Sequence, residues 1–172
     1  MNVLTFDTEE QIGIAAGYYM CGQVLQKPDS VLGLATGSTP LKPYAHMIKL
    51  YNEGAVDFSR VKTFNLDEYC NLDVKDKNSY HSFMYENLFN HINIPDENIN
   101  FLNGNAEDMD AECKAYEEKI KITEYHVACH PLAGNPAWDC YYYLRRQANG
   151  KFYISGSSIW IKECCSDDDV SV

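Results

Sequence analysis

The stretch that decides the fold is Val31–Pro40, VLGLATGSTP. It starts with a continuous run of apolar and small residues, Val31–Ala35, which is typical of a strand buried in a parallel sheet. The run ends in a polar turn, Thr36–Thr39, followed by Pro40. A threonine before a proline is a common helix start, with Thr39 as the N-cap and Pro40 as the first helical residue. The stretch therefore predicts a buried strand, a tight turn at Gly37 and a helix, in that order.

Helices and strands alternate on both sides of this stretch. A first helix is predicted from Thr8, because Thr8 and Gln11 fit a capping box and apolar residues recur at helical spacing as far as Val24. The further predicted elements are a helix from Pro40 that ends at Gly54, a strand over 60–66, a helix from about Tyr80, a weaker strand over 99–104 and a helix over 108–121. This order indicates a layered α/β domain with a parallel sheet.

The pattern changes after about residue 122. Residues 122–172 contain four of the seven cysteines and both tryptophans, but no clear amphipathic helix. Residues 151–162 are a hairpin candidate about Ser155–Gly156, and the last seven residues are expected to fray. We therefore expect a domain over residues 1–121 and an irregular tail over 122–172, either a divergent segment or the product of a frameshift.

A cluster of potential zinc ligands lies in this tail. His126, Cys129, His130 and Cys140 carry the nitrogen and sulfur atoms that zinc prefers, but their spacing fits no usual zinc motif. Free thiols are the favoured interpretation, and we expect no metal site. Tyr141–Tyr143 and the two arginines that follow are too short a run, in an acidic chain, to indicate RNA binding.

The charge of the chain narrows its partners and its location. Asp and Glu number 25 against 14 Lys and Arg, so the net charge of -11 disfavours binding to nucleic acid or to an anionic membrane surface. No apolar run approaches the ~18 residues of a membrane span. The first ten residues, MNVLTFDTEE, lack the basic region of a signal peptide. We therefore expect a cytoplasmic protein with reduced cysteines.

The turn after the first strand is a candidate phosphate site formed by Thr36, Gly37, Ser38 and Thr39. Ligands of open α/β sheets bind beyond the carboxyl ends of the strands, where this turn is predicted. Backbone N–H groups at the start of the following helix favour an anion. The turn lacks the lysine of a P-loop and the three glycines of a dinucleotide site, which favours a small phosphate monoester. A capped helix start without a ligand is the alternative.

An acidic pair follows the second predicted strand. Asp67 and Glu68 come directly after the strand over 60–66, and we expect them at the same edge of the sheet as the turn at Gly37. A carboxylate beside a bound sugar phosphate can act as a general base on a carbon next to a carbonyl. Partial burial would have to raise the pKa of Asp67 for that role. The alternative is a loop acid that caps an amide or faces solvent.

Three blocks of the chain together resemble glucosamine-6-phosphate deaminases: VLGLATGSTPLKPY, VKTFNLDEY and the long block from SYHSFMYENLF to YEEKI. The resemblance extends from near the N-terminus to about Lys121. It implies a Rossmann-like three-layer fold and the conversion of glucosamine 6-phosphate to fructose 6-phosphate and ammonia.

The resemblance also implies roles for individual residues. The loop Thr36–Thr39 would hold the sugar phosphate. Asp67 would take the proton from C2 of the opened sugar and return it at C1, with Glu68 in support. The family needs no metal or organic cofactor and usually forms homo-oligomers.

The sequence departs from the family after residue 121. Members continue into a glycine-rich block with an Asp-x-His pair that opens the sugar ring, and later supply an Arg and a Lys for the phosphate. HVACHPLAGNPAWDC contains no such block, so we expect little or no turnover by this chain. The alternatives are a non-catalytic sugar-phosphate-binding module and a related sugar-phosphate isomerase or lactonase.

Overall fold

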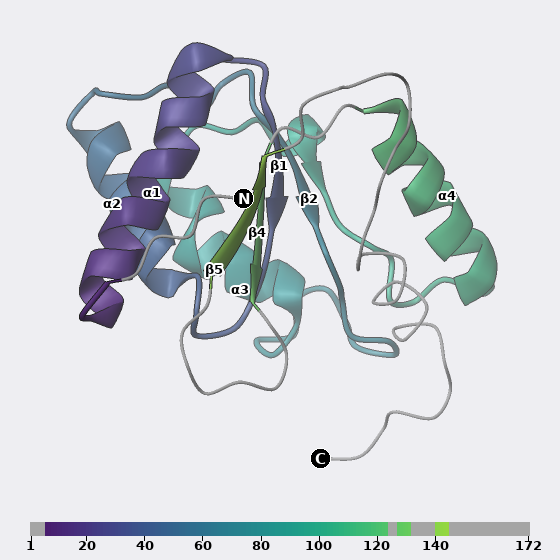
Figure 1. Ribbon diagram of the computed structural model, residues 1–172. Coiled ribbons are helices and arrows are strands. Elements are labelled where there is room, and N and C mark those ends of the chain that lie inside the picture. Colours follow the sequence, from purple (N-terminus) through teal and green to yellow (C-terminus); the bar gives the residue numbers. More distant parts are fainter. Residues whose placement is uncertain (1–5, 124–126, 132–139, 145–172) are drawn as a thin grey trace.

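The computed structural model describes residues 6–123, 127–131 and 140–144. Within them, helices cover both faces of one sheet (Figure 1). One face carries α1 (Glu9–Gln26), α2 (Leu41–Asn52) and α3 (Tyr80–Asn87), and the other carries α4 (Met109–Ile122). This three-layer arrangement confirms the predicted α/β fold class. The hairpin candidate at 151–162 lies outside the described residues.

The sheet has five strands in the order β3-β2-β1-β4-β5. The strands are β1 (Val31–Leu34), β2 (Lys62–Asn65), β3 (Ile99–Asn100), β4 (Val127–Pro131) and β5 (Cys140–Leu144). The first four are mutually parallel, and β5 pairs antiparallel with β4. We expected the alternation to stop at about residue 122, so β4 and β5 are additions to the prediction. A five-residue segment as mixed as VACHP shows no recognisable period, which is why the sequence did not reveal it.

The alternation of side chains along the strands divides the core into two parts. Leu32 and Leu34 belong to the larger cluster, which packs residues of α1, α2 and α3 together. Val31 and Phe64 point the other way and pack against Tyr116 of α4. Because β1 is buried at all four positions, it forms the centre of the domain, as the continuous apolar run predicted.

Helices α1 and α2 pack closely because α1 carries glycine at two points of contact, Gly13 and Gly17. A Cβ atom at Gly17 would lie 2.6 Å from the Cβ of His46, and one at Gly13 would collide with Lys42. The same interface carries an ion pair of 2.7 Å between Lys42 Nζ and Glu9 Oε2. Glycine therefore sets the distance between these two helices.

The predicted helix ends are confirmed in α1 and only partly in α2. Thr8 accepts a hydrogen bond from the Gln11 N–H in a complete capping box. In α2 the prediction of Thr39 as N-cap is wrong: the N-cap is Pro40, and it makes no side-chain cap bond. The reason is a turn closed by the Leu41 N–H and the Ser38 carbonyl at 3.4 Å, which takes up Thr39 as a central residue. Gly54 ends α2 with a positive φ of 72°, as predicted.

The cysteines differ in state. Cys21 and Cys70 are free thiols, one buried and one exposed, and burial raises the pKa of Cys21 to about 12. Cys113 is disulfide-bonded, which corrects the expectation of reduced cysteines throughout. Composition and spacing do not reveal which sulfur atoms meet in the fold. In the described part of the chain, every helix is too short or too polar to cross a membrane.

Candidate functional site

The strand order creates a switch point beside β1. From β1 the chain moves outward through β2 and β3, then returns to place β4 on the other side of β1. In open α/β sheets, ligands bind in the crevice at such a reversal, beyond the carboxyl ends of the strands. The loop that leaves β1 there is Ala35–Pro40, which contains the predicted phosphate-binding residues.

The loop Ala35–Pro40 is held at its base and open at Gly37. The Tyr44 hydroxyl of α2 donates a buried hydrogen bond of 2.6 Å to the Ala35 carbonyl. Gly37 has a φ of +88°, and no neighbouring atom lies within 4 Å of the position that a Cβ would take. A ligand can therefore approach the backbone at Gly37.

Asp67 lies in the loop that follows β2, partly buried. Burial and, to a smaller extent, the negative charge of Glu68 together raise the pKa of its carboxyl from 3.8 to about 6. A carboxylate with a pKa near 6 is a stronger base than an ordinary aspartate and is still ionised at neutral pH. This is the environment that a proton-abstracting Asp67 requires.

Glu68 occupies a different environment from its neighbour. Its side chain is buried and accepts three backbone N–H bonds, from Tyr69 and Tyr80 at 2.9 Å and from His81 at 2.8 Å. Tyr80 and His81 are the first residues of α3, so the carboxylate lies at the N-terminus of that helix. Glu68 therefore corresponds to the alternative weighed from the sequence, an acid that caps amides.

Tyr80 joins the two loops, and the sequence patterns did not single it out. The pKa of Tyr80 is raised by burial, by a hydrogen bond with Tyr69 and by the charge of Asp67, and it is lowered by a hydrogen bond from the Thr36 side chain. The Tyr80 hydroxyl donates to the Tyr69 hydroxyl at 3.4 Å, and the two ring centroids are 4.6 Å apart. The loop after β1 and the acid after β2 therefore lie at one edge of the sheet, as expected.

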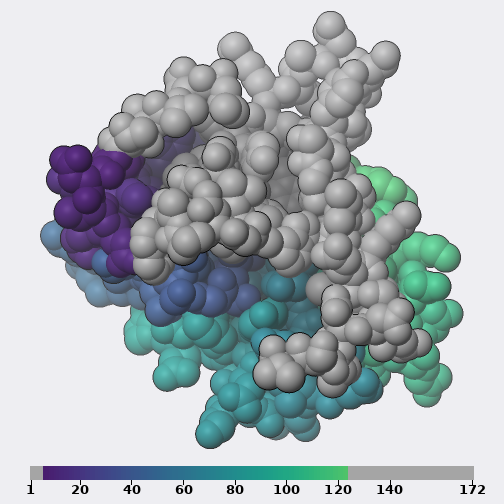
Figure 2. Space-filling view, turned by 60° about the horizontal axis from the view of Figure 1, so that its bottom comes forward, coloured from purple at the N-terminus to yellow at the C-terminus, as the bar shows by residue number. Residues whose placement is uncertain are grey.

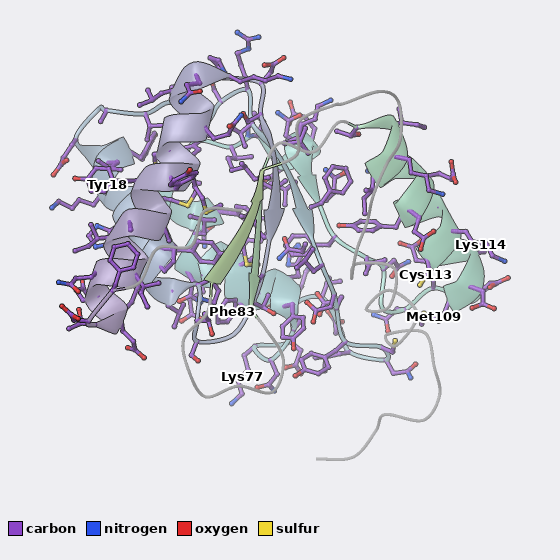
Figure 3. The ribbon with its side chains drawn as sticks, viewed as in Figure 1. Tyr18, Lys77, Phe83, Met109, Cys113 and Lys114 are labelled. Carbon is purple, nitrogen blue, oxygen red and sulfur yellow. The ribbon has the colours of Figure 1, made fainter. Side chains whose placement is uncertain are left out.

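A cavity of about 500 Å³ opens beside these groups. Its wall combines the loop after β1, the loop after β2 and the start of α3, and includes Gly37, Tyr69, Lys77, Asn78, Tyr80 and Phe83. Lys77 and Phe83 lie at the same lower end of the molecule in Figure 3. Figure 2 shows this end, where the surface of the segment around 60–100 adjoins that of α2.

The loop that carries Asp67 is fixed to the loop after β3. The Asn71 N–H donates to the Gly104 carbonyl at 2.9 Å, and the Asn105 amide donates to the Leu72 carbonyl at 2.7 Å. A Cβ atom at Gly104 would collide with the Tyr69 carbonyl. Behind both loops, the buried Tyr116 hydroxyl hydrogen-bonds to carbonyl oxygens of β2 and β3.

Two buried polar side chains of β2 have no hydrogen-bond partner among the described residues. They are Thr63 and Asn65, whose polar side-chain atoms are both shielded from solvent. Unpaired buried polar atoms are costly and call for an explanation. Asn65 stands two positions before Asp67, and nothing in the sequence pattern marked it.

The potential zinc ligands of the tail form no described metal centre. His126 lies outside the described residues, and Cys129, His130 and Cys140 are described only as backbone of β4 and β5. Over the side chains that the structure describes, no three His, Cys, Asp or Glu residues gather into a metal-binding group.

Comparison with known proteins identifies the family of this site. The family described as glucosamine-6-phosphate isomerases/6-phosphogluconolactonase matches residues 20–141. The chain belongs to this family. Its match includes the loop at Gly37, both acids and α3.

Curated members of the glucosamine-6-phosphate isomerase family show high identity to the chain. Glucosamine-6-phosphate deaminase from Thermoanaerobacter sp. is 50% identical over 121 residues, which are 70% of this chain and 48% of that protein. The deaminase from Mannheimia succiniciproducens is 62% identical over 91 residues, 53% of this chain and 34% of that protein. The chain thus spans about half the length of the curated relatives it matches.

Solved structures of family members have the same fold. A monomeric glucosamine-6-phosphate deaminase superposes with a TM-score of 0.69 at 38% identity, covering 71% of this chain and 51% of that one. A 6-phosphogluconolactonase from Thermotoga maritima superposes with a TM-score of 0.56 at 22% identity, covering 73% and 56%. The second likeness shows the fold alone, whereas the first is close in sequence as well.

Proposed function

We propose that this chain carries the phosphate-binding and proton-transfer part of a glucosamine-6-phosphate deaminase site. Thr36, Gly37, Ser38 and Thr39 bind the phosphate of the amino sugar. Asp67 is the general base that moves a proton from C2 to C1 of the opened sugar. The reaction then releases ammonia and leaves fructose 6-phosphate.

The observation that carries this proposal is the link between the two loops through Tyr80. The Thr36 side chain bonds the same tyrosine whose pKa responds to the charge of Asp67. A sugar phosphate anchored at Gly37 therefore has its carbon chain close to a carboxyl whose pKa is about 6. Identity of 50% to curated deaminases, against 22% to a lactonase, favours the deaminase over the related lactonase activity.

The proton transfer is simple in its balance. The Asp67 carboxylate removes the C2 proton while the C1 aldehyde oxygen gains a proton from solvent, which gives an enediol-type intermediate that still carries the amine. Asp67 then returns its proton to C1, and the amine lone pair forms a C=N bond, so C2 becomes an iminium carbon. Water adds to this iminium ion, and loss of ammonia and of the proton taken from solvent leaves the ketone, so the overall reaction is hydrolytic.

Proton exchange at C2 tests the role of Asp67 directly. Glucosamine 6-phosphate is incubated with the full chain in D₂O, and loss of the C2 proton signal is followed by NMR. We expect slow exchange by the wild type, limited to sugar whose ring opens spontaneously, with a rate that rises with pH through about 6 and then levels off, because only the ionised carboxylate accepts a proton. D67N is expected to abolish exchange, whereas the exposed Asp29→Asn should leave it unchanged.

Binding and ammonia release are measured on the same samples. We expect calorimetry to detect glucosamine 6-phosphate binding, and ammonia release to be low, because no Asp-x-His block is present to open the ring. Binding without C2 exchange would favour the alternative of a non-catalytic module. Absence of both binding and exchange would refute the proposal.

We further propose a cytoplasmic location, no cofactor, and a division of the chain into a family domain over residues 1–121 and a tail over residues 122–172, whose strands β4 and β5 extend the sheet of that domain. The acidic composition and the small metabolite substrate support the location. Light scattering of the purified chain decides whether it forms the homo-oligomer that the resemblance implies. Catalysis that survives exhaustive chelation is the expected result for a site built from Asp67 and backbone amides.

A further inference from the structure

The buried carboxylate of Glu68 has contacts that a solvent-facing loop acid would lack. Its Oε1 accepts the Tyr69 and Tyr80 N–H groups, and its Oε2 accepts the His81 N–H. Two of these donors belong to the first turn of α3, whose N–H groups have no acceptor within the helix itself. Ser79 supplies a further cap by accepting the Ser82 N–H at 3.0 Å.

The consequence is that α3 starts at a fixed place relative to Asp67. Glu68 follows Asp67 directly in the sequence, and its Oε1 accepts a hydrogen bond from the Tyr80 N–H at 2.9 Å. The Tyr80 side chain in turn lines one cavity with Gly37 of the loop after β1 and is hydrogen-bonded to Thr36 of that loop. A chain of contacts thus runs from the acid, through Glu68 and Tyr80, to the loop at Gly37.

We propose that Glu68 and Tyr80 are a pair of positioning residues, in which Glu68 fixes the first turn of α3 so that the Tyr80 hydroxyl holds the Thr36–Thr39 loop at the right place beside Asp67. Neither residue transfers a proton in the reaction. The role of these contacts in catalysis rests on the proposed function. The contacts themselves are present without a ligand.

The pKa of Asp67 reports on the charge of Glu68. Burial is the larger cause of the raised pKa of Asp67, and the negative charge of Glu68 is the second cause. On the side of α3, the neighbours are the phenols of Tyr80 and Tyr69, and Lys77 lines the same cavity. His81 takes part through its backbone N–H. Replacement of Glu68 therefore changes both a helix start and the field at Asp67.

Three substitutions in the full chain separate these effects. In E68Q the amide NH₂ group meets the His81 N–H as a second donor and the charge is lost. In E68D the charge stays but the side chain is one methylene too short to reach α3. In Y80F the backbone hydrogen bonds to Glu68 stay, but the hydrogen bond between Thr36 and the Tyr80 hydroxyl is lost. The matched controls on α3 are Glu86→Gln, which is exposed, and Tyr85→Phe, whose hydroxyl bonds Asp96.

The measurements are amide hydrogen exchange of peptides 36–40 and 79–83, and ¹³C NMR titration of the Asp67 carboxyl. We expect E68Q to speed exchange in both peptides and to lower the pKa of Asp67. E68D should speed exchange and leave that pKa raised. Y80F should speed exchange in 36–40 alone by about 3- to 10-fold, the ratio expected for one hydrogen bond.

The outcomes decide the inference without any ligand. The proposal fails if E68Q matches E86Q in both measurements, or if Y80F matches Y85F in peptide 36–40. If E68Q loses its cooperative thermal transition, E68D and Y80F decide alone. A wild type that binds no glucosamine 6-phosphate refutes the proposed function, and the exchange data still decide this inference.

Discussion

Replacement of Asp67 by asparagine should make the protein more stable at neutral pH, although it removes the proposed base. The folded state holds the Asp67 carboxyl in a partly buried place beside the charge of Glu68, which raises its pKa above the ordinary value. Ionisation of this carboxyl therefore favours the unfolded chain. Asparagine has nearly the same shape and carries no charge, so D67N avoids this penalty.

The magnitude and its sign follow from the pKa. A rise from 3.8 to about 6 corresponds to about 3 kcal/mol, at about 1.4 kcal/mol per tenfold change in proton affinity. Because Asp67 keeps some exposure to water, we expect about 2 to 3 kcal/mol in practice. Below pH 3.8 the contribution of the protonated Asp67 is fully present, and it is lost as the pH rises through about 6. D67N should therefore equal the wild type at low pH and exceed it above pH 6.

Urea unfolding between pH 3.5 and pH 8 provides the assay. The difference in unfolding free energy between D67N and the wild type is plotted against pH, and it should grow from near zero to its plateau around pH 6. Asp57 supplies a control of opposite sign, because hydrogen bonds from Asn93 and Ser59 lower its pKa. D57N should therefore be less stable than the wild type above pH 3.8, and this deficit should shrink only as the pH falls below 3.8. A D67N protein that is less stable than the wild type at pH 7.5 would refute the reasoning.

Three further substitutions test the packing around the site. G17A should lower the unfolding free energy by about 1 to 3 kcal/mol in urea titrations, because the new Cβ would lie 2.6 Å from that of His46. Y116F should lower it by about 1 to 3 kcal/mol, since it removes a buried hydroxyl that bonds two strand carbonyls. G37A should cost about 1 to 2 kcal/mol by forcing φ away from +88° and should weaken sugar-phosphate binding in calorimetry, whereas G22A on open helix surface should do neither.

The elements with a strong local signal could be predicted from the sequence. The capping box at Thr8, the buried strand over 31–34 and the helix from Tyr80 all depend on residues within one or two turns of each other. The prediction of Thr39 as N-cap was wrong because the sequence permits two helix starts, one residue apart, and the turn closed by the Ser38 carbonyl decides between them. Strand β4 was missed because VACHP shows no recognisable period and its parallel partner β1 lies far away in the sequence, and β5 was missed with it because it pairs with β4.

The residues of the candidate site also divide into those with a local sequence signal and those without one. The positions of Asp67 and of the loop at Gly37 could be predicted because each follows an apolar strand, which places it at the carboxyl edge of the sheet. The role of Glu68 as a cap, and that of Tyr80 as a bridge, depend on contacts across 12 to 44 positions of sequence. No local pattern reports such contacts. The unpartnered amide of Asn65 is likewise visible only when its surroundings are known.

The contact between Gly104 and the Tyr69 carbonyl has a consequence for protein engineering. The two segments that meet there, 69–72 and 103–105, interlock without room for a methyl group. Because two hydrogen bonds also cross this contact, from Asn71 to Gly104 and from Asn105 to Leu72, a change in the length of one segment should displace the other. A library that aims to change substrate preference should therefore transplant both segments from one donor, as a single cassette.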